Sequence, residues 1–130
     1  MAWYIDTSAL VKLVSVEAET AALHEWIATN NPELVSSDLL RTELLRAVRR
    51  SGAAQELDID DGLAAIDMLP ATAAVFDAAG LVEPLELRSL DAVHLATAID
   101  IRDDCDGFIT YDDRLAAAAR HHELDVIAPS

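Results

Sequence analysis

Four acidic side chains, widely spaced along the chain, could together bind a divalent cation. They are Asp6, Glu43, Asp91 and Asp112. Four carboxylates at one edge of a fold would repel one another strongly unless a cation neutralised them. Oxygen ligands in this number suit Mg²⁺ or Mn²⁺. Because such ions clamp phosphoryl oxygens, activate water and stabilise a leaving oxygen, the set predicts hydrolysis of phosphodiester bonds.

Two of these acids follow predicted strands, and each has a structural alternative as a helix cap. Asp6 comes directly after the apolar run at 2–5, and Asp112 comes just after GFIT at 107–110. Aspartate is a favoured N-cap residue, and so Asp6, Asp112 or the neighbouring Asp113 could simply begin a helix. An acid that directly follows a buried strand is costly unless it is paired or bound to a metal, which favours a functional role for Asp6.

The other two acids lie on predicted helices, and each could have an ordinary surface role. Glu43 could pair with Arg46 one turn further on. It also borders the buried stripe of its helix, from which a carboxylate can turn into a cleft. Asp91 could be a first-turn acid favoured by the helix dipole. Its neighbours in SLDAVHLATA are almost all small and apolar, which indicates a face made for close packing.

The elements that must position these acids alternate along the chain. Strands are predicted at 2–5, 34–36, 107–111 and 124–128, and helices at 9–14, 18–29, 38–50, 62–69, 73–79, 89–101 (capped by Ser89) and from Asp112 or Asp113 to about 121. Strands separated by helices predict parallel βαβ units, and hence one domain over 1–130 with the α/β fold of an α/β/α sandwich. Sites in such sheets form outside the carboxyl ends of the strands, where both Asp6 and Asp112 fall.

Composition limits the classes of function. The chain has 130 residues and a net charge of −15, so it cannot hold nucleic acid by overall charge. Cys105 is its single cysteine, and no pair of histidines has the spacing of zinc ligands. The sequence has no run of apolar residues long enough to cross a membrane and begins with no basic, apolar leader, which predicts a cytoplasmic protein.

Four of the few basic residues are grouped, and the others are dispersed along the chain. Arg41, Arg46, Arg49 and Arg50 lie on one predicted helix, and Arg114 lies beside the last acid. They could form a solvated face with ion pairs. Together they are also the local basic surface that could contact RNA phosphates, for which we single out Arg46, Arg49, Arg50 and Arg114.

Four stretches, in order over nearly the whole chain, resemble the PIN-domain family and in particular its VapC-type toxins: YIDTSALVKL, RTELLRA, LRSLDAVHLATA and GFITYDDRLAAAA. The resemblance implies a metal-dependent endoribonuclease with a compact α/β/α fold. Residue by residue, the four acids of the family fall on Asp6, Glu43, Asp91 and Asp112. Ser8 falls on the polar residue that accompanies the first acid, and Thr110 and Asp113 are close to the fourth.

The resemblance also implies partners: a VapB-like antitoxin protein that blocks the site, an RNA substrate and a second copy of the chain in a homodimer. Mg²⁺ or Mn²⁺ would be the cofactor. A cluster of carboxylates suits an inserted Arg or Lys side chain from the antitoxin.

Two other classes of function stay open at this point. One is a receiver-like or phosphotransfer domain, which also uses an acidic pocket and Mg²⁺, although the only lysine, Lys12, is badly placed for it. The other is a catalytically silent module that only binds a partner. His94, one turn after Asp91, is interpreted as a packed, hydrogen-bonded core histidine.

Overall fold

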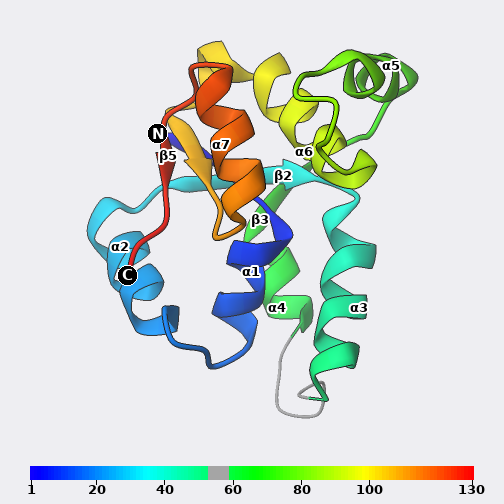
Figure 1. Cartoon of the computed structure of the whole chain (residues 1–130). Helices are drawn as coiled ribbons and strands as arrows, with labels where there is room; N and C mark the ends of the chain where they lie inside the picture. The colour runs from blue at the N-terminus through cyan, green and yellow to red at the C-terminus, as the bar shows by residue number, and fades with distance from the viewer. Residues whose placement is uncertain (53–58) are drawn as a thin grey trace.

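A parallel sheet of five strands lies at the centre of the computed structural model, which describes residues 1–52 and 59–130 (Figure 1). The strands are β1 (Ala2–Ile5), β2 (Glu33–Ser37), β3 (Ile66–Leu69), β4 (Gly107–Ile109) and β5 (Val126–Ile127). Their order across the sheet is β3-β2-β1-β4-β5. All four neighbouring pairs are parallel, as the alternation of strands and helices predicts.

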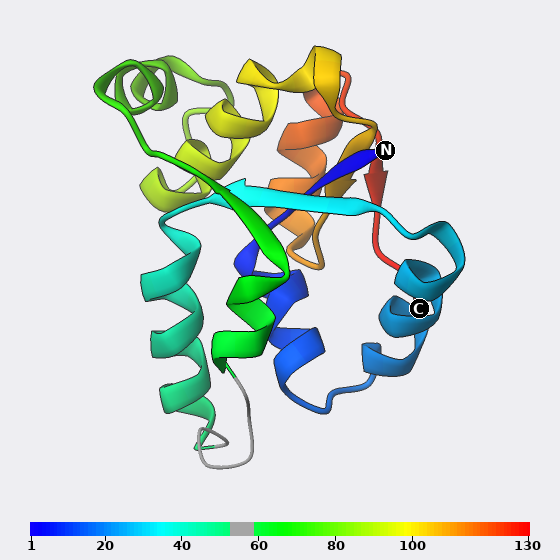
Figure 2. The same ribbon diagram turned by 180° about the vertical axis from the view of Figure 1, so that it is seen from behind.

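Helices cover both faces of this sheet. They are α1 (Thr7–Val14), α2 (Thr20–Asn30), α3 (Leu40–Ser51), α4 (Ile59–Ala64), α5 (Ala73–Leu81), α6 (Ser89–Asp100) and α7 (Asp113–His121), with a short 3₁₀ turn, η1 (Arg102–Asp104). Figures 1 and 2 show α1 to α4 on one side of the sheet and α5 to α7 on the other. The predicted α/β/α sandwich is therefore confirmed.

The two central strands supply both halves of the core because successive side chains point to opposite faces of a sheet. Ile5 and Ile109 belong to the cluster packed by α1 to α3, whereas Tyr4 and Phe108 belong to the cluster packed by α6 and α7. All four side chains are completely buried. Burial on both faces explains why these strands are apolar runs in the sequence rather than alternating ones.

One predicted helix, at 62–69, is wrong. The helix α4 ends at Ala64, and Ile66–Leu69 is the edge strand β3, paired with β2. The exposure of this strand alternates at first, with Ile66 buried and Asp67 exposed, which is the pattern of a strand. Pairing with β2 overrides the local helical preference, and Pro70 then ends the strand where no further ladder bond is needed.

Other boundaries shift by a few residues. The helix predicted at 73–79 continues through Gly80, and α5 ends at Leu81. Ser89 was expected to cap α6, but it is the first helical residue, and Arg88 before it makes no side-chain capping bond. The strands predicted at 107–111 and 124–128 are shorter, ending at Ile109 and Ile127.

The register of the sheet places two strand ends side by side. Ile5 of β1 pairs with Ile109 of β4, and the amide of Asp6 donates to the carbonyl of Ile109 at 3.3 Å. The chain leaves β1 toward β2 on one side, while β4 joins it from the other. This is the point at which strand order reverses, where α/β sheets form their binding crevices.

None of the helices in the described ranges, 1–52 and 59–130, combines the length and apolar character needed to cross a membrane.

Close packing at the start of β4 generates a test of the fold. A Cβ atom at Gly107 would lie against the Trp3 ring and 2.7 Å from the carbonyl oxygen of Asp125. Because backbone cannot easily move away, we expect Gly107→Ala to lower the free energy of unfolding by about 1–3 kcal/mol. Urea denaturation measures this change.

Gly80→Ala is the matched control, since a Cβ at that helical position meets nothing within 4 Å. It should leave stability unchanged or raise it by up to about 1 kcal/mol. Equal stability of the Gly107→Ala protein and the wild type would contradict the packing described for β1, β4 and β5.

Candidate active site

Asp6 lies at the carboxyl end of β1 and is only 3% exposed. Its Oδ1 accepts the backbone N–H of Ala9 at 3.1 Å, so it is the N-cap of α1. The Ser8 hydroxyl donates to both carboxylate oxygens, at 2.8 and 3.0 Å, and the Thr110 hydroxyl donates to Oδ2 at 2.7 Å. The capping role and the buried, hydrogen-bonded role are therefore both true of Asp6.

Burial dominates the electrostatics of Asp6. Removal from water raises the pKa of its carboxyl to about 6, although the hydrogen bonds from the hydroxyls of Thr110 and Ser8 act to lower it. Among the described residues, no Lys or Arg forms an ion pair with Asp6. The Asp6 carboxylate is thus almost inaccessible to water, and its hydrogen bonds do not fully compensate the free-energy cost of burying its charge.

Thr110 and Ser8 connect the first acid to the last. Thr110 follows β4, and its hydroxyl accepts the N–H of Asp112 at 3.1 Å. Ser8 accepts the N–H of Tyr111 at 2.9 Å. Both hydroxyls therefore join the loop after β4 to the carboxylate after β1, and the structure places these predicted supporting residues in contact with Asp6.

The choice between Asp112 and Asp113 as the helix cap is decided by hydrogen bonding. Asp112 is the N-cap of α7, and its Oδ1 accepts the N–H of Leu115 at 2.9 Å. Asp113 is exposed in the first turn of α7. Asp112 is thus the acid whose backbone is bonded to Thr110 and whose side chain caps α7, whereas Asp113 does not cap the helix.

Glu43 sits on α3 beside the first turn of α1. Its Oε1 accepts the Thr7 hydroxyl at 3.1 Å and contacts Nε2 of His94 at 2.5 Å. Its side chain is 20% exposed. In the described part of the chain Glu43 forms no ion pair with Arg46, so the surface ion pair considered from the sequence is absent there.

Asp91 is in the first turn of α6, with a side chain 20% exposed. Burial raises the pKa of its carboxyl, and the negative charges of Asp112 and, more weakly, Glu43 raise it further. Arg88 lowers the pKa from 3.6 Å away, but its own side chain is 74% exposed. These like-charge effects place Asp112 and Glu43 each within electrostatic reach of Asp91.

The predicted acids therefore gather around the carboxyl ends of β1 and β4, although they are not closed around a single point. Within residues 1–52 and 59–130, no three His, Cys, Asp or Glu side chains are already spaced to hold one metal ion together. These residues supply a set of carboxylate and hydroxyl oxygens, which includes the buried carboxylate of Asp6. Such hard oxygen donors fit Mg²⁺ or Mn²⁺.

Two contacts of this site could not be found from the sequence. Thr7 holds Glu43, and His94 links Glu43 to Tyr4 in the core. The interpretation of His94 as a buried, hydrogen-bonded core histidine is confirmed, since it is 1% exposed. Its second ring nitrogen nevertheless reaches the site. The one available signal was that His94 follows Asp91 by three residues, a spacing that puts both on adjoining sides of a helix.

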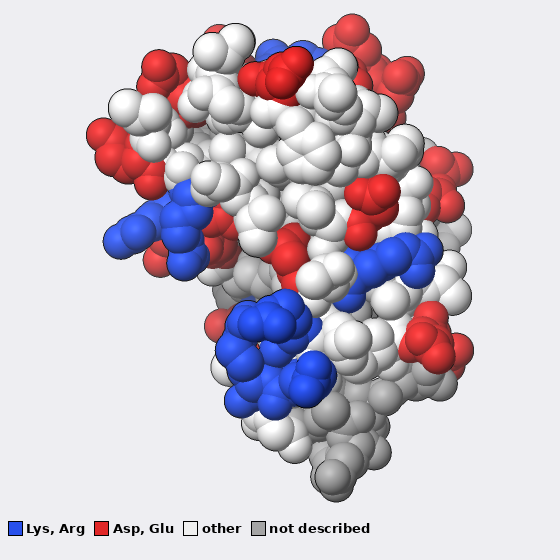
Figure 3. Space-filling model, turned by 90° about the vertical axis from the view of Figure 1, so that its right-hand side faces the viewer, with Lys and Arg blue, Asp and Glu red and all other residues white. Residues whose placement is uncertain are grey.

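The predicted basic surface lies on α3. Arg46, Arg49 and Arg50 together line one shallow hollow. Figure 3 shows Lys and Arg side chains clustered on the face where α3 lies, among separate Asp and Glu side chains. Arg114 lies apart from this cluster, on α7, where it lines another hollow with Glu83 and His121.

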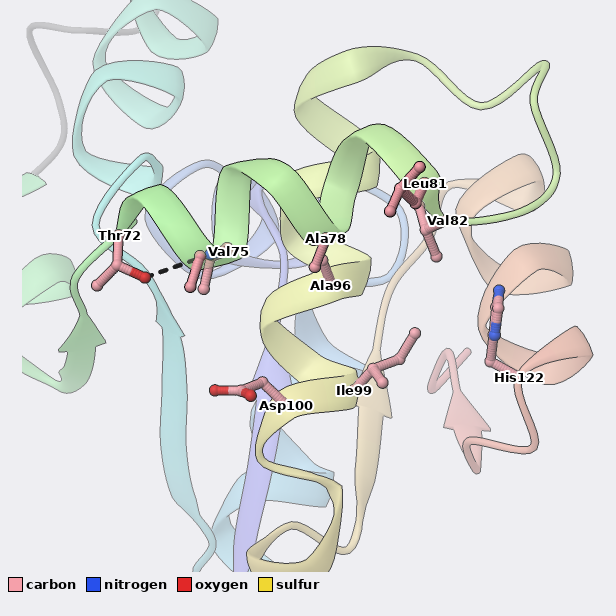
Figure 4. A pocket seen from close by; sticks show the side chains of 10 residues that line it. Thr72, Val75, Ala78, Leu81, Val82, Ala96, Ile99, Asp100 and His122 are labelled. Atoms are coloured by element: carbon pink, nitrogen blue, oxygen red, sulfur yellow. Dashed lines mark hydrogen bonds between the residues drawn. The ribbon is translucent and has the colours of Figure 1, made fainter.

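A second kind of hollow, of about 460 Å³, lies between α5 and α6 (Figure 4). Its lining is mostly aliphatic, including Val75, Leu81, Val82 and Ile99. None of the four predicted acids lines it. Because its lining is mostly apolar and contains none of these acids, the candidate active site is the acid cluster rather than this hollow.

Comparison with known proteins gives consistent results. The family model named PIN domain matches residues 3–121. Ribonuclease VapC46 of Mycobacterium tuberculosis is 43% identical over 127 residues, which are 98% of this chain and 97% of that protein.

Solved structures agree with this assignment at the level of the fold. The Mycobacterium tuberculosis toxin VapC20, described as cleaving the sarcin–ricin loop, superposes with a TM-score of 0.73 at 18% identity, over 98% of this chain and 99% of its own. A toxin–antitoxin complex from Klebsiella pneumoniae gives 0.70 at 18% identity, over 98% and 97%. The chain belongs to the PIN-domain family, within the group of proteins related to VapC.

Proposed function

We propose that the protein is a metal-dependent endoribonuclease that acts as the toxin of a toxin–antitoxin pair. The observation that carries the proposal is the buried Asp6 carboxylate at the junction of β1 and β4, with three further acids around it. Membership of the PIN-domain family and relatives named as ribonucleases support the same activity. The receiver-like alternative has no such support.

Each acid has a distinct task in this proposal. Asp6, Asp91 and Asp112 would hold Mg²⁺ or Mn²⁺, and Glu43 would hold a second ion or orient the attacking water. When bound, the cation would supply charge to stabilise the transition state and the leaving oxygen. Ser8 and Thr110 keep the Asp6 carboxylate in place by donating to it, and hydrolysis would leave a 5′-phosphate and a 3′-hydroxyl.

The basic cluster on α3 gives an acidic protein a place for RNA. Arg46 and Arg50 follow Glu43 by three and seven residues, so they continue the same side of the helix away from the acids. Contacts from Arg46, Arg49 and Arg50 to phosphates would position the RNA without reading its sequence. Arg114 would add a contact from the other side of the site.

A VapB-like antitoxin is the proposed inhibitor, and a homodimer the proposed assembly. The solved complex from Klebsiella pneumoniae, which contains a toxin and an antitoxin, supports the first. An Arg or Lys of the antitoxin would compensate the same buried carboxylates that otherwise hold the cation.

Substitution of the acids tests the activity. Asp6→Asn, Asp91→Asn and Asp112→Asn should each lower the rate of RNA cleavage by at least about 100-fold while circular dichroism shows the fold intact. The exposed neighbour Asp113→Asn is the matched control and should cleave at the rate of the wild type. Excess EDTA should abolish cleavage, and added Mn²⁺ should restore it. Undiminished RNA cleavage by the wild type in excess EDTA would contradict the proposed metal dependence.

The burial of Asp6 predicts a pH dependence of stability. Its pKa in the folded state is raised to about 6, so the folded protein binds a proton where the unfolded chain has lost it. The contribution of Asp6 to the free energy of unfolding is fully present below about pH 4 and is lost as the pH rises through 6. In EDTA at pH 8, Asp6→Asn should therefore unfold with a free energy up to about 3 kcal/mol higher than wild type.

The difference between the two proteins should shrink toward pH 4, because Asp6 is then protonated in the folded wild type. Urea denaturation at pH 4, 6 and 8 measures it, with Asp113→Asn as a control that should follow the wild type. An Asp6→Asn protein less stable than wild type at pH 8 would show that the charge is not a cost to the fold.

The role of the basic cluster predicts a salt effect. Replacing Arg46, Arg49 and Arg50 together by alanine should raise the KM for an RNA substrate and flatten its dependence on salt, because fewer phosphate contacts release fewer counterions. The kcat should change little. Arg102→Ala is the control, because Arg102 lies in η1 before β4, at the amino end of that strand and so opposite the carboxyl end where the acids lie. An unchanged salt slope in the triple variant would exclude α3 as the RNA-binding surface.

A further inference from the structure

We infer that Tyr4 and His94 are positioning residues, which hold the Glu43 carboxylate by one oxygen and leave its other oxygen to the active site. The inference rests on the proposed function and adds to it two residues that touch neither the RNA nor the other acids. It is carried by a continuous chain of hydrogen bonds from the backbone of the sheet to Glu43.

The chain begins on β2. The backbone N–H of Ser37 donates to the Tyr4 hydroxyl at 3.1 Å, and this hydroxyl contacts Nδ1 of His94 at 2.6 Å. Nε2 of His94 then contacts Oε1 of Glu43 at 2.5 Å. Tyr4 and His94 are 0% and 1% exposed, so water does not compete for either contact. The links come from β2, β1, α6 and α3.

The acceptors in this chain determine where the hydrogen atoms lie. A carboxylate can only accept, so the hydrogen between His94 and Glu43 belongs to Nε2. In a neutral imidazole Nδ1 is then an acceptor, and it takes the hydrogen of the Tyr4 hydroxyl. That hydroxyl in turn accepts the fixed N–H of Ser37. Each group has one role, so the chain selects a single tautomer and orientation of the ring.

The result at Glu43 is an asymmetry between its two oxygens. Thr7 and His94 both contact Oε1. The hydrogen bonds of Glu43 to other described residues reach Oε1 alone. Two contacts on one atom restrict the rotation of the carboxylate, and they leave Oε2 without a hydrogen bond to another described residue. Mutation of partners that orient a metal-ligating group in this way typically lowers metal affinity or activity by about 10- to 100-fold.

Paired substitutions separate positioning from packing. His94→Leu fills the space but has no donor, whereas His94→Gln keeps an N–H for Glu43. We expect His94→Leu to lower kcat and the calorimetric affinity for Mn²⁺ by about 10- to 100-fold, with the KM for RNA unchanged. His94→Gln should recover a large part of both losses. Tyr4→Phe, which leaves Nδ1 without its donor, should lower kcat as well.

A spectroscopic measurement tests the geometry without metal or RNA. In the metal-free wild type, long-range ¹H–¹⁵N spectra of the imidazole should show the hydrogen of His94 on Nε2. Tyr4→Phe should shift the Nδ1 signal, and Glu43→Gln should shift the Nε2 signal. A hydrogen on Nδ1, or signals insensitive to both changes, would overturn the inference.

The activity data overturn it in two further ways: if folded His94→Leu keeps the wild-type kcat and Mn²⁺ affinity, or if His94→Gln loses as much as His94→Leu. Either result with an active wild type rejects the positioning role alone. A wild type that neither binds Mn²⁺ nor cleaves RNA rejects the proposed function instead, and the positioning role with it.

Discussion

Asp6 places a carboxylate with almost no access to water at the end of the central strand of the sheet. Its position follows from the pairing of β1 with β4, since Ile5 and Ile109 are partners and the residues after them must meet. The arrangement of Ser8, Thr110 and the start of α1 around it supplies hydrogen bonds to both of its oxygens. A buried charge of this kind reduces the stability of the fold unless a cation compensates it. A carboxylate kept in such an unfavourable position is therefore a candidate functional group.

Two of the surrounding acids use one carboxylate oxygen in the contacts that hold the fold together. Asp112 uses Oδ1 to cap α7, and Glu43 uses Oε1 to accept from Thr7 and His94. One oxygen of each carboxylate thus sets its orientation through a fixed element of secondary structure. The helix caps that the sequence suggests as an alternative to function are therefore part of the same arrangement, because capping orients the acid at the edge of the sheet.

Much of this could be predicted from the sequence. The apolar runs at 2–5 and 107–109 identify buried parallel strands, and the rule that sites form at their carboxyl ends brings Asp6 and Asp112 together. The strand β3 was missed because its pairing with β2 is a tertiary contact that local periodicity does not contain. The contact of His94 with Glu43 was missed for the same reason, since α3 and α6 are 51 residues apart at these positions.

In the proposed function, acids gathered around a cation and arginines along α3 let a protein with a net charge of −15 act on an anionic substrate. This function requires that Asp6 and its neighbours bind that cation directly. A crystal grown with Mn²⁺ and measured at the manganese absorption edge tests this. We predict an anomalous peak in contact with carboxylate oxygens of Asp6 and of Asp91 or Asp112. A fully occupied manganese site elsewhere, with no peak at Asp6, would contradict it.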